Sequence, residues 1–414
     1  MQPSVEAKKN ILRTLPRNVW AVSLTSFLMD ISSEMVINIL PLFLSNVLGV
    51  KTSIIGLIEG AAEMTASLLK MFSGWFSDKI GNRKWLAVGG YALSAITKPF
   101  FYFANSWGLV AGARWVDRVG KGIRTAPRDA LVADSIQEEQ RGLAFGFHRA
   151  ADTAGALLGL MIAFAVTWFF QHNSPLLSAD TFRLIVLISI VPAALAVLVL
   201  AIGVQEAVKK KQHQLPKFAF RRLGKSFMTF MLIVALFDIG NSSDAFLVLR
   251  AQERGVNILG ILGMLITFNL IYSLISTPAG ALSDRVGRSK IIIAGWLFYA
   301  FIYLGFALAQ NAIQIWLLYA GYGLYYGLAY GTTKALVADI VPVELRGTAY
   351  GTYNGIIGII DLPASLIAGF LWQGAGAWQG FGASAPFYFG AGTAFLATIL
   401  MFLWLRTVKL PNHS

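Results

Sequence analysis

Apolar segments of about 20 residues recur along this chain, each long enough to cross the roughly 30 Å hydrocarbon core of a bilayer as a helix. A lipid-exposed span must satisfy its own backbone hydrogen bonds, so such segments fold as helices. The pattern predicts an all-α polytopic membrane protein with twelve transmembrane helices. They lie near 18–46, 54–76, 85–104, 107–132, 143–169, 182–204, 227–249, 257–281, 289–309, 313–338, 347–373 and 384–406.

The composition excludes several functional classes. Charged residues make up 13% of the 414 residues, against about 25% in soluble domains. The absence of cysteine excludes disulfides, thiol catalysis and thiolate metal sites. The four histidines are too scattered for a histidine metal cluster, so we expect no metal and no cofactor. The sequence contains no phosphate-binding G-x-x-x-x-G-K-[ST] loop and no nucleophile–base set, which disfavours an ATP-driven pump and an enzyme.

The net charge of +13 reflects topology better than nucleic-acid binding. Lys and Arg gather in alternate loops, at the N-terminus and near 79–84, 209–225, 285–290 and 406–409, as the positive-inside rule requires of cytoplasmic loops. An even number of spans places both termini on one side, so both are expected in the cytoplasm. The first apolar run is too long for a signal peptide. We therefore expect a multi-pass protein of the inner (cytoplasmic) membrane, a monomer in the lipid bilayer with no nucleic-acid partner.

The two halves of the chain repeat each other. GWFSDKIGNRK at 74–84 matches GALSDRVGRSK at 280–290, and ALVADSIQEEQRGLAFG at 130–146 matches ALVADIVPVELRGTAYG at 335–351. A weaker match joins Asp30-Ile-Ser-Ser-Glu34 to Gly240-Asn-Ser-Ser-Asp244. Repeats of this kind are typical of transporters that rock around a site between their halves. We expect two pseudo-symmetric six-helix bundles, 1–204 and 226–414, joined by a basic cytoplasmic linker, 205–225.

These repeated blocks resemble the signature loops of the major facilitator superfamily over essentially the whole chain. The resemblance implies a twelve-helix fold with alternating access to a central site. It also implies that the blocks act as gating loops on the cytoplasmic side. The residues that would act there are Gly74, Asp78, Arg83, Arg141, Gly280, Asp284, Arg285, Arg288 and Arg346.

One predicted helix, 107–132, carries six charged residues: Arg114, Asp117, Arg118, Lys121, Arg124 and Arg128. Each costs about 2.5–3.5 kcal/mol near the bilayer centre unless it faces a partner or water. The five cations cluster on one helical face, as in a protein that handles anions. Arg114 resembles an arginine that drug-exporting members of the superfamily link to proton exchange. Arg118 replaces their glycine four residues on, which disfavours an ordinary multidrug pump.

Other predicted helices add acidic and basic residues at membrane depth. They are Asp30 and Glu34 in the first helix, Glu59 and Glu63 in the second, His148, Arg149 and Asp152 in the fifth, and Asp244 in the seventh. Two interpretations stay open. These groups either form fixed structural pairs, such as Glu63 with Arg118, or a switchable proton relay in which surplus cations bind the substrate. Competition between substrate and proton for one cation would couple their movements.

Tyr322, Tyr326 and Tyr330 recur at helical spacing in the tenth helix. Their hydroxyls are expected to face the cationic wall from the second bundle, although the tyrosines and glycines there also suit close helix packing. A cationic wall facing a phenolic one favours an amphiphilic organic anion.

We therefore predict a secondary active transporter, coupled to protons, for a polycarboxylate, siderophore-like or organophosphate anion. Proton-driven multidrug efflux is one alternative. A non-transporting membrane sensor or scaffold with the same fold is the other.

Overall fold

A computed structural model describes residues 15–137, 140–171, 174–206, 223–342 and 345–407. In the first half of the chain, the first span is made of α2 (Arg17–Ile37), α3 (Leu40–Leu42) and the π-helical turn η2 (Phe43–Val47). The next five spans are α4 (Thr52–Ile80), α5 (Arg83–Tyr102), α6 (Trp107–Asp134), α7 (Arg141–Gln171) and α8 (Ala179–Gly203).

The second half of the described chain repeats this order. Its first span is α9 (Gly224–Ile239) followed by α10 (Ala245–Glu253). The others are α11 (Ile258–Val286), α12 (Arg288–Leu308), α13 (Ala312–Ile340), α14 (Arg346–Gln373) and α15 (Ala385–Thr407). The twelve-helix layout is thus confirmed for the described residues. Seven of these spans are long and apolar enough to cross a membrane by composition alone.

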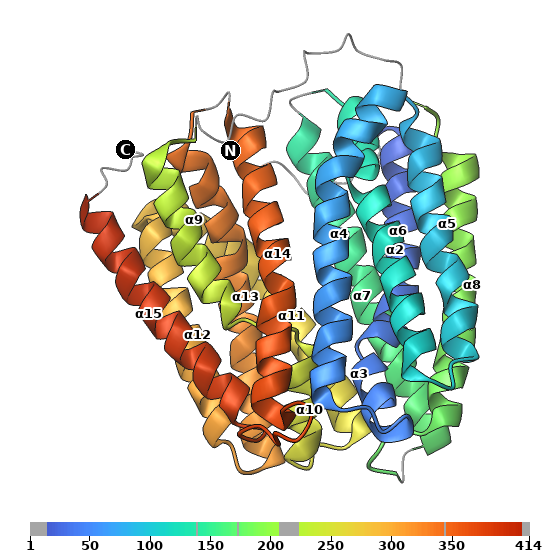
Figure 1. Cartoon of the computed structure of the whole chain (residues 1–414). Helices are drawn as coiled ribbons and strands as arrows, with labels where there is room; N and C mark the ends of the chain where they lie inside the picture. The colour runs from blue at the N-terminus through green and yellow to red at the C-terminus, as the bar shows by residue number, and fades with distance from the viewer. Residues whose placement is uncertain (1–14, 138–139, 172–173, 207–222, 343–344, 408–414) are drawn as a thin grey trace, which may run out of the picture.

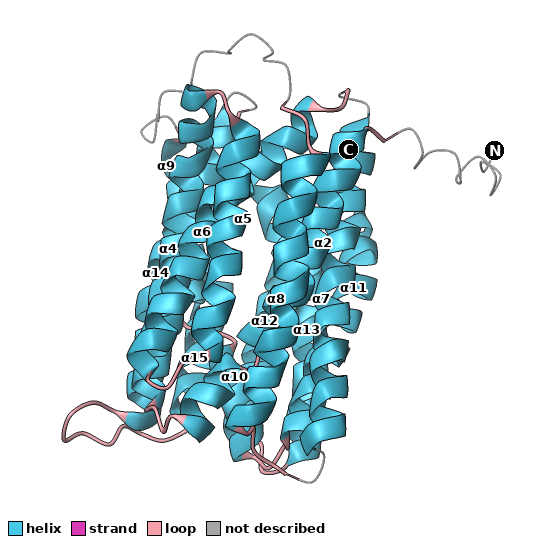
Figure 2. Ribbon diagram, turned by 90° about the vertical axis from the view of Figure 1, so that its right-hand side faces the viewer, coloured by secondary structure: helices cyan, strands magenta, loops and turns pink. Residues whose placement is uncertain are grey.

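The helices form two bundles that stand side by side, with the described loops at the two ends of the molecule (Figures 1 and 2). The first bundle contains α2 to α8, with α2 packed against α7 and α8 and α6 against α4 and α5. The second contains α9 to α15, with α13 packed between α11 and α12. We call the end where α2 begins and α15 ends the terminal side, and the other end the opposite side.

Local sequence sets the helix ends. Side-chain oxygens of Asn82, Ser106, Asn257 and Asn311 accept hydrogen bonds from backbone N–H groups three residues on, as N-cap residues do. Gly81 ends α4 in the left-handed conformation, with φ 67°, which glycine adopts without steric cost. These caps fall at both sides of the membrane and fix the lengths of the spans.

Two spans that the sequence predicted as continuous are interrupted. In the first span the α-helix is interrupted at Asn38 and Ile39. Pro41, which has no backbone N–H to donate, lies just after this interruption. The seventh breaks at 240–244, between α9 and α10. Ser243 explains part of this break, because its backbone N–H donates to Ser365 Oγ and its own hydroxyl accepts from the N–H of Ala245.

The bundles meet along two seams, α4 against α14 and α7 against α11. Glycines bring α4 and α14 together. A Cβ placed on Gly60 would lie 2.9 Å from Leu362 Cα, and one on Gly369 would lie 2.7 Å from Ser53 Cα. Toward the terminal side, Gly351 and Gly347 of α14 face open space. The α4–α14 seam is therefore tightest in its middle and at the opposite side.

Hydrogen bonds between uncharged groups also join the bundles at the opposite side. Gln252 Nε2 donates to Asn46 Oδ1 at 2.7 Å, and Thr52 donates to Gln373 Oε1 from its backbone N–H at 2.7 Å. The N–H of Ile258 donates to the carbonyl of Pro175 at 3.1 Å. These contacts close the opposite side of the space between the bundles.

Candidate functional site

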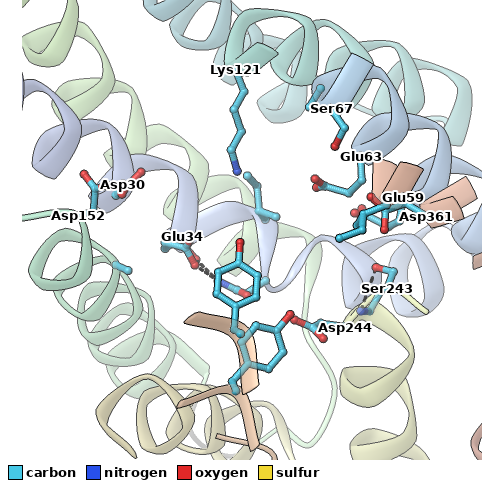
Figure 3. A pocket seen from close by; sticks show the side chains of 18 of the residues that line it. Asp30, Glu34, Glu59, Glu63, Ser67, Lys121, Asp152, Ser243, Asp244 and Asp361 are labelled. Atoms are coloured by element: carbon cyan, nitrogen blue, oxygen red, sulfur yellow. Dashed lines mark hydrogen bonds between the residues drawn. The ribbon is translucent and has the colours of Figure 1, made fainter. Parts of the chain in front are cut away.

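A cavity of about 690 Å³ lies between the two bundles and is lined by residues of both. Figure 3 shows Lys121 reaching into it, with Asp30 and Asp152 on one side and Glu63, Glu59 and Asp361 on the other. The volume falls within the range of about 300–1,000 Å³ that is usual for small-molecule sites. Charged and polar side chains together make up most of the lining, so the cavity suits a cargo with polar or ionic groups.

Arg114 is the centre of a buried ion-pair cluster beside this cavity. Its guanidinium holds Glu59 through two hydrogen bonds, of 2.6 Å from Nη2 and 3.3 Å from Nε, and contacts Glu63 Oε1 at 3.2 Å. Arg114 is 2% exposed, and Asp117 lies 3.7 Å from its Nη1. The bidentate geometry is the strong, directional kind that favours arginine over lysine.

Arg118 and Lys98 complete this cluster. Arg118 lies 3.3 Å from Glu63 and 3.4 Å from Asp117, so the expected pair of Glu63 with Arg118 is observed. Lys98 of α5 is fully buried within electrostatic range of Asp117, and its Nζ has no hydrogen-bond partner in the described residues. We call these residues the inner charge cluster, which contains three cations and three carboxylates: Lys98, Arg114, Arg118, Glu59, Glu63 and Asp117.

Lys121 and Arg124 differ from the cations of the inner charge cluster. Lys121 lines the cavity, and no carboxylate of the described chain lies within ion-pair distance of its Nζ. Arg124 also lines it and donates to Ser94 Oγ at 2.7 Å while its guanidinium lies 4.5 Å from the Tyr91 ring centroid. Neither cation is neutralised by direct contact with an acid. Both are therefore placed to receive an anionic ligand.

An annex of about 180 Å³ extends from the cavity into the first bundle, between α2, α4 and α6. Arg118, Lys121 and Arg124 line it opposite Asp30 and Glu34. Asp30 makes no ion pair or hydrogen bond through its side chain within the described part of the chain, and Glu34 accepts from Asn38 Nδ2 at 2.7 Å. The annex thus brings Lys121 and Arg124 near Asp30 and Glu34 without an ion pair between these cations and these carboxylates in the described residues.

The fifth predicted helix contributes less than the sequence suggested. Asp152 and Arg149 line the cavity, and Arg149 Nη2 donates to the Tyr272 hydroxyl of the other bundle at 2.9 Å. His148 does not line it, because its ring is buried behind Asp152, 3.8 Å from that carboxylate. His148 can affect a ligand through Asp152 rather than by contact.

The second bundle supplies a wall of carboxylates and phenols. Asp244 accepts from the Tyr322 hydroxyl at 2.8 Å, and Asp361 faces the cavity from α14. Tyr326 and Tyr330 line the cavity with stacked rings 5.7 Å apart. Tyr322 is a correction to the expected phenolic wall. Its ring is fully buried among other aromatic rings, and it reaches the cavity through Asp244.

The gating-loop residues form matching contacts in the two bundles. Arg83 pairs with Asp134, and Arg288 pairs with Asp339 at 2.8 Å and with Asp284 at 3.2 Å. Arg346 donates to the carbonyl of Ala338 at 3.1 Å, Arg285 is exposed, and Gly74 packs beside Ala126. A Cβ on Gly280 would face open space. The side chains of Asp78 and Arg141 lie outside the described part of the structure.

Some residues at the site were not expected from the sequence. Lys98 is a single lysine in an apolar stretch, and Asn38, Asn241, Asn269 and Tyr272 are uncharged polar residues that line the cavity. Each was a charged or polar residue at membrane depth, which is the signal that would have identified it.

A family model described as the Major Facilitator Superfamily matches residues 22–359 and 226–414. The chain belongs to this superfamily. An uncharacterized MFS-type transporter of Methanocaldococcus jannaschii is 36% identical over 87% of this chain and 90% of its own length. The multi-drug resistance efflux pump PmrA of Streptococcus pneumoniae is 24% identical over 77% of this chain and 79% of its own.

The fold comparison agrees with this assignment to the major facilitator superfamily. The solved structure of a bacterial homolog of the human lysosomal transporter Spinster, in an inward-facing and occupied conformation, superposes with a TM-score of 0.78. It is 15% identical, and the match covers 96% of this chain and 98% of that one. The protein is a multi-pass membrane transporter and not an enzyme.

Proposed function

We propose that this transporter moves an amphiphilic organic anion, coupled to protons, by alternating access of the cavity to the two sides of the inner membrane. The anionic group of the cargo lies against Lys121 and Arg124, and its apolar part lies against Tyr326 and Tyr330. A polycarboxylate, a siderophore-like compound and an organophosphate all fit this description. The observation that carries the proposal is the Lys121 ammonium, which faces the cavity without a carboxylate partner in the described residues.

The coupling follows from the position of Asp30. Its carboxylate lies within electrostatic range of both Lys121 and Arg124 and partly compensates them in the empty site. An anion bound to these cations repels the Asp30 carboxylate and favours its protonated form. Anion and proton then bind together. The inner charge cluster has the structural role, because its cations and carboxylates compensate one another.

The remaining candidate residues have supporting roles in this proposal. Glu34 and Asp152 share the proton with Asp30, and His148 positions Asp152. Asp244 accepts polar groups of the cargo, and Tyr322 orients its carboxylate. The gating loops regulate the terminal side by forming and breaking contacts such as that of Arg288 with Asp339.

Transport by purified protein in vesicles tests the anion site. Citrate and phenyl phosphate serve as anionic probes. We expect Lys121→Gln to lower their uptake about 10- to 100-fold, because a charge-assisted hydrogen bond contributes about 1.5–3 kcal/mol. Lys51→Gln removes the same charge from an exposed position on the opposite side and is the matched control. Equal uptake by Lys121→Gln and wild type would refute the proposed anion site.

Proton coupling is tested with the Asp30→Asn variant in the same vesicles. This variant should still bind the anion, but its uptake should no longer respond to an imposed pH gradient, because residue 30 can no longer exchange a proton. Glu34→Gln is the neighbouring comparison, and its hydrogen bond with Asn38 predicts a smaller effect. A wild-type response to the gradient in both variants would assign the coupling to other groups.

Drug efflux is the second candidate, supported by two observations. Asp361 has no cation within ion-pair distance in the described residues, and Asp244 is held by a neutral phenol, so both can receive a lipophilic cation. The relative PmrA is named as a multi-drug resistance efflux pump. Ethidium transport in the same vesicles separates the candidates. Transport of ethidium but not of either anion would favour efflux.

We propose that the terminal side faces the cytoplasm. Lys79, Lys84, Arg285, Lys290 and Arg406 lie at the ends of helices on that side, as the positive-inside rule requires. The cysteine-free chain allows a direct test with Gln137→Cys on the terminal side and Asn105→Cys on the opposite side. In intact cells a membrane-impermeant maleimide should label Asn105→Cys and spare Gln137→Cys. The reverse pattern would invert the orientation.

A further inference from the structure

Four cations from both bundles surround the cavity between Lys121 and the terminal side. They are Lys70 of α4, Arg128 of α6, Arg149 of α7 and Lys334 of α13, and all line the cavity. Arg128 lies seven residues beyond Lys121 on α6, or about 10 Å closer to the terminal side at 1.5 Å per residue. We call these four residues the mouth cluster. It is separate from the cations assigned above to the anion site.

The members of the mouth cluster are electrostatic neighbours. Lys70 is within range of Lys334 and Arg128, and the Tyr330 hydroxyl is within range of Lys70, Arg149 and Lys334. Lys334 Nζ donates to that hydroxyl at 3.0 Å and lies 4.3 Å from the ring centroid. Tyr330 therefore sits at the centre of the cluster, and the cations approach it from both bundles.

Nearby acids compensate this charge in part. Asp129 pairs with Arg128 at 2.8 Å, and Asp152 lies within range of Arg149. Lys70 makes no ion pair in the described residues, and Lys334 contacts a neutral phenol. These two lysines lie on opposite bundles, α4 and α13. Their repulsion opposes any movement that brings the bundles together at the terminal side.

The contrast with the opposite side indicates what this charge does. Hydrogen bonds between uncharged groups, such as that of Gln252 with Asn46, hold the opposite side closed. The terminal side instead has like charges across the gap. The charge distribution therefore favours a cavity open toward the terminal side until an anion enters the mouth cluster.

We propose that the mouth cluster is a second anion site, which binds a carboxylate or phosphate group and thereby permits the terminal side to close. The group bridges Lys70 and Lys334 and replaces their repulsion by two attractions. This inference rests on the proposed anion transport, because the cargo supplies the bridging group as it passes toward Lys121. A small inorganic anion of the same chemistry is the other source.

Distances between spin labels at Gln137→Cys and Ala281→Cys, one on each bundle at the terminal side, test the proposal on the purified full chain. Both positions are exposed. Citrate and inorganic phosphate are titrated separately. Closure of wild type by citrate alone identifies the cargo as the source, and closure by both identifies the anionic group itself. High potassium chloride, which screens repulsion between solvated charges, should shorten the wild-type distance without either anion.

The deciding variant is Lys70→Gln with Lys334→Gln. It should show the short distance without any anion, and its response to citrate should fall at least about tenfold. Lys84→Gln with Lys225→Gln removes one lysine from each bundle on the same side but outside the cavity, and should behave as wild type. A wide distance and a normal citrate response in the Lys70/Lys334 variant would refute the proposal.

The same measurements separate this proposal from the proposed function. If Lys121→Gln abolishes the citrate response and the Lys70/Lys334 variant keeps it, the anion site stands and the mouth cluster fails. If neither anion closes wild type but salt does, and the Lys70/Lys334 variant is closed throughout, the repulsion is supported and the anion cargo is refuted. If no condition moves the wild-type distance, both proposals fail.

Discussion

At the scale of single residues, α6 places two kinds of cation seven positions apart. Arg114 is fixed by Glu59 and Glu63, whereas Lys121 faces the cavity without a direct acidic partner in the described residues. The same helix thus combines a cation held in a buried ion pair with a cation that faces the cavity without one. Burial and partners, rather than residue type, distinguish the two roles.

This difference predicts that removing the Arg114 charge destabilises the fold and that removing the Lys121 charge does not. Arg114→Met should lower the stability of the fold by about 3–5 kcal/mol, because it leaves buried carboxylates without their cation. Lys121→Met should leave stability near that of wild type, since no direct ion pair is lost. The midpoint of thermal unfolding in detergent measures both. Equal midpoints for the two variants would contradict the structural role of Arg114.

Individual residues were also where prediction from the sequence failed. Helical periodicity placed the cations of α6 on one face, but it could not show that Lys98 of α5 completes the inner charge cluster. Arg250 was missed for a similar reason. It is fully buried in α10, where it donates to the carbonyls of Phe306 and Ala307 at the end of α12. Such partners are distant in sequence, and no local pattern reveals them.

At the scale of helices, the seam between α4 and α14 depends on small residues. Gly60 and Gly369 allow backbone atoms of the two bundles to approach closely, as in other tightly packed membrane helices. Hydropathy located the spans well, because length and apolar composition are local properties. The break at 240–244 was not predicted, since Gly240, Asn241 and Ser243 act through contacts with other helices.

The close packing of α4 against α14 predicts that adding one methyl group at Gly60 is destabilising. Gly60→Ala should destabilise the protein by about 1–3 kcal/mol and reduce transport, because the new Cβ meets the backbone of Leu362 and the bundles must shift apart. Gly112→Ala adds the same group at an exposed position of α6 with open space around it, and should have no such effect. Thermal unfolding and vesicle uptake measure the pair. A matching loss in both variants would show that the contact with Leu362 is not its cause, because helix propensity alone favours alanine over glycine at both positions.

At the scale of the whole molecule, the two ends of the cavity are bordered by different kinds of side chain. Uncharged hydrogen bonds close the opposite side, whereas the cationic mouth cluster borders the terminal side. Alternating access requires the hydrogen bonds of the opposite side to break while the cations of the mouth cluster come closer together. The sequence repeats predicted two bundles, but the contacts that hold one side closed depend on side chains far apart in the chain.

A cross-link at the opposite side tests this requirement. Asn46→Cys and Gln252→Cys replace two side chains that hydrogen-bond across the bundles, in a chain without other cysteines. A short bifunctional thiol reagent should join them and abolish transport, because the opposite side can no longer open. Each single-cysteine variant, treated with the same reagent, should keep its activity. Undiminished transport by the cross-linked protein would show that this contact does not have to break.

The size of the cavity has a further consequence, which concerns water. At about 30 Å³ per molecule, 690 Å³ holds on the order of twenty waters when no cargo is bound. A charged lining keeps such a space hydrated, and closure around a smaller cargo expels part of that water. Each transport cycle therefore changes the number of waters in the cavity as well as moving a solute. Osmolytes too large to enter should favour the closed cavity, and transport should respond to osmotic pressure even at a constant cargo gradient.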